Sequence, residues 1–167
     1  ATNSLTKIVA PATEDNSLKF YLAQALAVRA FDYFTLAQLY QHTYVGNETK
    51  PCVPIITEAN ADDAAANGCA RATVATVEEV YAQIMSDLNT AISLLESSSM
   101  KRADKRYVDA SVAYGLRARV NLVMNNWADA ASDAQKAISL HDGQPYSREE
   151  VSKPTFSDIE DASWMWG

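Results

Sequence analysis

The stretch NNWADAASDAQKAI, Asn125 to Ile138, decides the fold. Two asparagines, which favour turns, precede a tryptophan, and small apolar residues then recur at the spacing of one helix face. A shift of 46 residues superposes this stretch on an earlier amphipathic helix: Tyr81 falls on Trp127, Ile84 on Ala130, Leu88 on Ala134, Ala91 on Ala137 and Ile92 on Ile138. The spacing predicts one unit of an internal repeat.

The helices that precede these two also match, because Arg29-Ala30 aligns with Arg117-Ala118 at a shift of 88 residues. The larger shift predicts an insertion in the first unit, within 41–75. Each unit is expected to be a helix hairpin in which Ala30 or Ala118 permits close approach and Tyr81 or Trp127 fills the gap beside the turn. Chance alignment is the alternative, and matches in both helices favour stacked repeats.

Hydrophobic periodicity predicts four helices and a mainly α fold of stacked hairpins with one long inserted loop. The first, over 17–40, is apolar nearly all round and therefore buried, with Arg29 reaching a carboxylate or a carbonyl. Thr76 and Glu79 form a capping box that opens the second. Asp109 caps a helix over 110–124, and the fourth ends near Leu140.

These elements predict three parts. Residues 1–16 form a lead-in with a short helix over 4–9, and 17–140 hold two hairpins interrupted by the loop 41–75. Residues 141–167 form a loop and the start of a following region, with a strand beginning at 163–166. A loop of this length is a functional excursion or a mobile segment.

Composition excludes some functions. The 167 residues carry a net charge of −7 at a pI near 4.7, so a nucleic-acid partner is not expected. No apolar run approaches the roughly 18 residues that span a bilayer.

Catalytic chemistry is not supported. The sequence contains neither a glycine-rich phosphate loop nor a Gly-x-Ser-x-Gly turn. His42 and His141 stand far apart without a neighbouring nucleophile. We therefore expect a protein that is not an enzyme, with no catalytic residue, metal or cofactor.

Aromatic residues outside the helix stripes are the candidate ligand contacts, because sites for small ligands combine aromatic surface with a few polar groups. They are Tyr44, Trp164 and Trp166. Packing of the two tryptophans against the helices is the alternative.

Two cysteines, Cys52 and Cys69, lie in the inserted loop without the further ligands of a zinc site. They form a disulfide in an oxidising compartment or remain two thiols in a reducing one.

Several blocks of sequence, in this order, resemble the SusD/RagB family of nutrient-binding outer-membrane lipoproteins of Bacteroidetes. Alanine and aromatic spacing in the last block is also that of a tetratricopeptide repeat. The blocks are VRAFDYFTLAQLY (28–40), VPIITE (53–58), RATVATVEEVYAQIMSDLNTAISLL (71–95) and GLRARVNLVMNNWADAASDAQKAI (115–138). The inserted QHTYVGNETKPC departs from the family, whose members are also longer and carry a lipidated cysteine.

The resemblance implies an internal, helical portion of a cell-surface lipoprotein, attached to the outer membrane only through a lipid outside this chain. Such a protein binds an oligosaccharide or peptide and delivers it to a SusC-like TonB-dependent transporter. It also favours the Cys52–Cys69 disulfide. The alternative is a cytosolic tetratricopeptide adaptor that docks partner proteins.

Overall fold

The computed structural model describes residues 13–41, 43–56, 62, 74–141, 143, 145–152 and 158–167. Within them the chain is mainly α-helical, as the periodicity predicts. Its elements are helix α2 (Asn16–Tyr40), strand β1 (Pro51–Pro54), strand β2 (Val74–Thr76), helices α4 (Val77–Ser97), α5 (Ala110–Val123) and α6 (Trp127–Leu140), and the 3-10 turn η1 (Glu150–Ser152).

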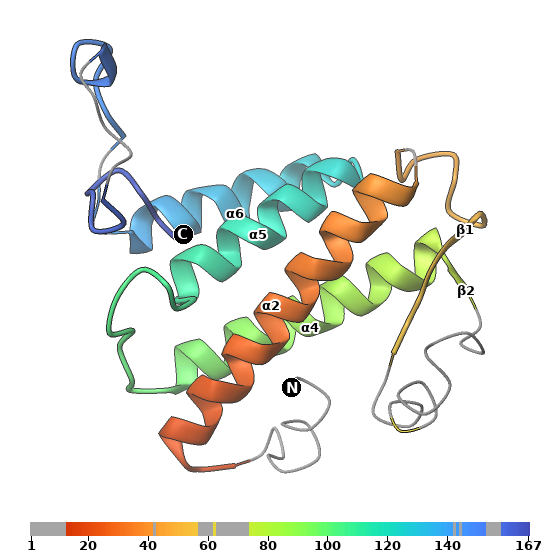
Figure 1. Cartoon of the computed structure of the whole chain (residues 1–167), viewed down its shortest axis with the longest axis horizontal. Helices are drawn as coiled ribbons and strands as arrows, with labels where there is room; N and C mark the ends of the chain where they lie inside the picture. Colours follow the sequence, from red (N-terminus) through yellow and green to blue (C-terminus); the bar gives the residue numbers. More distant parts are fainter. Residues whose placement is uncertain are drawn as a thin grey trace.

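The four helices form two antiparallel hairpins, α2 with α4 and α5 with α6, and the second hairpin packs on the first mainly through α4 and α5 (Figure 1). The two strands lie at the end of the first hairpin where α2 ends and α4 begins. The connection 98–109 and the C-terminal segment lie at the opposite end.

The helix starts follow their capping residues. The Thr76 hydroxyl accepts from the Glu79 amide at 3.2 Å while the Glu79 carboxylate accepts from the Thr76 amide at 2.7 Å, which confirms the capping box. Asp109 accepts from the Val112 amide at 3.0 Å and caps α5 as expected. Each cap satisfies amides that have no partner inside the helix.

The turn between α5 and α6 is as short as the paired asparagines suggest. Asn125 adopts a φ of 62°, in the left-handed region that asparagine tolerates better than most residues. The Asn126 amide donates to the Asn121 carbonyl at 2.9 Å. This geometry reverses the chain within three residues.

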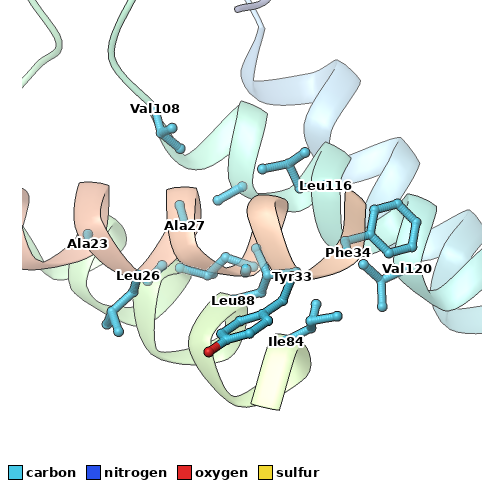
Figure 2. Close-up of a cluster of buried hydrophobic side chains, with 14 of the residues drawn as sticks. Ala23, Leu26, Ala27, Tyr33, Phe34, Ile84, Leu88, Val108, Leu116 and Val120 are labelled. Carbon is cyan, nitrogen blue, oxygen red and sulfur yellow. The ribbon is translucent and has the colours of Figure 1, made fainter. Parts of the chain in front are cut away.

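Small residues let the hairpin helices approach closely. Ala23, Ala27, Ala30 and Ala37 of α2 are at most 1% exposed, and Ala91 of α4 is fully buried. The larger side chains fill the space between α2, α4 and α5 (Figure 2) and include Leu26, Phe34, Ile84, Leu88, Leu116 and Val120. One core therefore joins both hairpins.

The described part of the inserted region is less irregular than expected. β1 and β2 pair antiparallel, with Pro51 opposite Thr76 and Pro54 opposite Val74. The Ile56 amide donates to the Tyr33 hydroxyl at 2.8 Å and attaches the region to α2. The strand at 74–76 was not predicted.

Two sequence-based expectations are wrong. Trp127 does not fill a gap beside its turn, because its side chain is 60% exposed, whereas Tyr81 is 2% exposed. The Tyr44 ring packs on Tyr81, and the short turn before Trp127 supplies no such residue. Residues 163–166 form no strand, because 158–167 consist of turns and irregular backbone.

Three further expectations fall outside the described residues: the short helix over 4–9, His42 and the partner role of Cys69. Among the helices that are described, none combines the length and the apolar character needed to cross a membrane.

Candidate functional site

Each hairpin contains the same bidentate ion pair. Arg29 donates from Nε and Nη2 to Asp87 at 2.7 and 2.6 Å, and Arg117 does so to Asp133 at 2.8 and 2.6 Å. Asp87 and Asp133 are 3% and 6% exposed. The hydrogen bonds to these carboxylates raise the pKa of both guanidinium groups, although burial acts in the opposite direction. Both guanidinium groups therefore remain charged.

Sequence reasoning found only part of this arrangement. It expected Arg29 to meet a carboxylate or a carbonyl, but it did not identify Asp87 or the second pair. The signal was present, because the shift of 46 that aligns Tyr81 with Trp127 also aligns Asp87 with Asp133.

Tyr44 packs against the first hairpin. Its ring lies 4.8 Å from that of Tyr81, which meets Phe34 edge-to-face at 6.1 Å. Burial is the main cause that raises the pKa of Tyr81 to about 12, and burial also raises the pKa of Tyr44. Tyr44 is half-buried, so only part of its ring faces solvent.

Cys52 lies near this aromatic group. Burial raises the pKa of its thiol, which lowers its reactivity as a thiolate. Cys69, the other half of the expected disulfide, belongs to the residues that are not described, so the pairing stays a prediction.

Trp166 packs at a different place, because its ring meets Phe31 of α2 edge-to-face at 5.2 Å. Its indole nitrogen donates to the Arg106 carbonyl at 3.3 Å. Trp164 is half-buried in the same segment. Since Tyr44 rests on α4 and Trp166 on α2, the three candidate ligand contacts do not form one aromatic surface.

The C-terminal segment 158–167 is fastened to the connection between the hairpins. Arg102 donates to the Met165 carbonyl at 2.7 Å and also pairs with Asp109 at 2.8 Å. Lys105 donates to the carbonyls of Glu160 and Asp161. Two cationic side chains thus join the hairpin connection to the segment that follows α6.

A cavity of about 560 Å³ lies beneath this junction. Phe20, Leu95 and Leu140 contribute apolar surface, and Lys101 and Glu160 are among the charged residues at its edge. Six of the fifteen lining residues are charged, so the cavity is more polar than the usual pocket for a small ligand.

Gly143 closes one side of the cavity by a close approach that no side chain permits. A Cβ atom at this position would lie 1.9 Å from the Ala162 carbonyl oxygen and 2.4 Å from His141 Nε2. The ring nitrogen of His141 is buried and has no hydrogen-bond partner among the residues described. His141, for which the sequence offers no catalytic role, is one of the residues that line this cavity.

Comparison with known proteins shows which family and which solved structures this chain is similar to. A SusD-like family, described as starch-binding and associating with the outer membrane, matches residues 1–122. A SusD-like carbohydrate-binding protein of Bacteroides vulgatus is 26% identical and superposes with a TM-score of 0.80 over 99% of this chain and 34% of that protein.

Two more solved structures are similar. A SusD superfamily protein of Bacteroides thetaiotaomicron is 25% identical, with a TM-score of 0.73 over 90% of this chain and 32% of its own. A laminarin-binding SusD-like protein is 26% identical, with a TM-score of 0.60 over 87% of this chain and 28% of its own. No curated protein sequence matches. The chain thus spans about a third of the length of these structures.

Proposed function

Because the chain belongs to the SusD-like family of starch-binding proteins that associate with the outer membrane, we propose that it is the helical portion of a cell-surface glycan-binding protein. The observation that carries this proposal is the superposition of 99% of the chain on a SusD-like carbohydrate-binding protein at a TM-score of 0.80. The laminarin-binding relative supports neutral glucans as the first ligands to test.

In this proposal the two hairpins are a scaffold. Their buried Arg–Asp pairs and shared core hold the inserted region at one end and the C-terminal segment at the other. Tyr44, Trp164 and Trp166 are proposed to contact glycan through the ring surface that their packing leaves accessible.

The protein is proposed to pass its ligand unchanged to a SusC-like TonB-dependent transporter, and to be held at the outer membrane by a lipid outside this chain. Outer-membrane association in the family description supports this part of the proposal.

The test uses the full-length protein. Calorimetric titration with maltoheptaose and laminarihexaose is expected to give saturable binding without any change in the oligosaccharide, and affinity purification from native membranes is expected to recover a TonB-dependent transporter. Absence of glycan binding would contradict the first part, and recovery of the protein without a transporter would contradict the second.

A further inference from the structure

The two hairpins differ around their common Arg–Asp pair. The shift of 88 residues aligns Tyr33 with Asn121. The shift of 46 residues aligns Val80 with Asn126 and Gln83 with Asp129. Two of the differences put a short amide in place of an aromatic or aliphatic side chain, and the third puts a carboxylate in place of an amide. Since the first hairpin packs its pair without them, the scaffold alone does not require them.

These polar residues line a groove of about 360 Å³ between α4, α5 and α6. Asn89 of α4 and Ser132 of α6 also line it, and Met85 adds an apolar wall. In the first hairpin the equivalent of Asp129, Gln83, turns to its own pair and donates to Asp87 at 2.9 Å.

A continuous network holds the groove in place. The Asn126 side-chain amide donates to the Asn121 side-chain oxygen at 3.3 Å, and the Asn121 side-chain amide donates to the Asp133 carboxylate at 3.1 Å. Arg117 donates from Nη1 to the Asn89 side-chain oxygen at 2.7 Å. Asn121 and Asp133 are 3% and 6% exposed, so packing fixes them. A ligand that meets this network does not have to order it, which reduces the entropic cost of binding.

We propose that this groove is a saccharide subsite for a neutral, hydroxyl-rich ligand, separate from the Tyr44 and Trp166 surfaces; the proposal rests on the proposed glycan-binding function. The Asn89 amide can donate, the Asp129 carboxylate can accept and the Ser132 hydroxyl can do both, which matches sugar hydroxyls. The groove has one cation, Arg117, against two carboxylates, Asp129 and Asp133, so an anionic ligand is disfavoured.

The experiment is hydrogen–deuterium exchange of the full-length protein with saturating maltoheptaose or laminarihexaose, and with oligogalacturonate as the anionic comparison. We expect exchange of amides in 126–133 to slow at least about threefold with a neutral oligosaccharide and to stay unchanged with oligogalacturonate.

Two variants sharpen the test. Ser132→Trp fills the groove and should abolish the protection, whereas Ser86→Trp, at the equivalent exposed position of the first hairpin, should leave it intact. Asp129→Gln installs the residue of the first hairpin and should weaken the neutral ligand at this groove about tenfold, because a hydrogen bond to a charged acceptor is lost.

The outcomes separate the two proposals. Glycan binding without protection of 126–133, or protection that survives Ser132→Trp, would overturn the subsite and leave the glycan-binding function standing. Protection by oligogalacturonate equal to that by the neutral glucans would overturn the ligand class. Absence of any glycan binding would remove the proposed function, and the subsite with it.

Discussion

At the scale of single residues, the two Arg–Asp pairs constrain the hairpins most. Each places a nearly buried carboxylate against a planar guanidinium in a two-point contact that tolerates little rotation. Burying two charges gives little net stability, but removing one partner leaves the other charge buried without compensation.

Asp87→Ala should therefore lower the free energy of unfolding by about 3 kcal/mol, since Arg29 would remain largely buried. Urea denaturation measures the change. Glu14→Ala is the control, because the Glu14 side chain, which pairs with Lys19, is 97% exposed and its removal should alter stability far less. Equal losses in the two variants would contradict the role assigned to burial.

The raised pKa of Tyr81 predicts how the stability of the fold changes at alkaline pH. Its pKa in the folded protein is about 12 against an ordinary value of 10.0, so the unfolded chain loses the proton first as pH rises. The stability that Tyr81 contributes is complete below pH 10 and is lost between pH 10 and about 12. Thermal melts across this range should show a steeper decline for the wild type than for Tyr81→Phe, and parallel declines would contradict the assignment.

Residue-level prediction from sequence succeeded where the cause was local. Thr76 with Glu79 and Asp109 were identified because a cap depends on its next three residues. Trp127 was misassigned because its exposure depends on a segment that packs in one hairpin and has no counterpart in the other. Asp87 could not be predicted from the apolar periodicity, because that pattern does not identify a buried polar position within a helix.

At the scale of elements, the turn between α5 and α6 depends on a single backbone conformation. Asn125→Val should cost about 1–2 kcal/mol, because a β-branched side chain is strained at the positive φ of this residue. Asn125→Gly should be near neutral, because glycine adopts that region freely. Denaturant unfolding of both variants measures the contrast, and equal effects would show that the conformation does not matter.

The helices could be predicted from periodicity, but the small sheet could not. β1 pairs with β2 across about twenty intervening residues, and neither strand is long enough to show an alternating pattern. The strand expected at 163–166 is absent although the sequence there does alternate. Trp164 and Trp166 alternate as strand residues do, but 158–167 has no strand to pair with and is hydrogen-bonded to Arg102 and Arg106 of the hairpin connection among the described residues.

At the scale of the whole molecule, the junction of the hairpins with the C-terminal segment depends on Arg102. Arg102→Met keeps the aliphatic stem but removes the contacts to Asp109 and the Met165 carbonyl. Amide exchange in 158–167 should rise several-fold while exchange in α2 and α4 stays unchanged. Arg148→Met, in an exposed position, is the control, and unchanged exchange at 158–167 in Arg102→Met would contradict the role of Arg102.

The family could be identified from sequence because ordered blocks of helix carry it, and the fold match agrees with them. The candidate ligand residues could not be fixed in the same way. Tyr44 and Trp166 are spaced far apart in sequence, and only the folded chain shows that they rest on different helices.

The exposed indole of Trp127 also gives this protein an internal optical probe. Within these 167 residues, Trp164 and Trp166 are half-buried in the C-terminal segment, whereas Trp127 stands 60% exposed at the first turn of α6. Acrylamide should therefore quench Trp127 emission preferentially. In the 167-residue chain, a molecule that covers the end of the second hairpin where α6 begins would shield Trp127 and shift its emission to the blue, so Trp127 fluorescence can report whether that end is occupied.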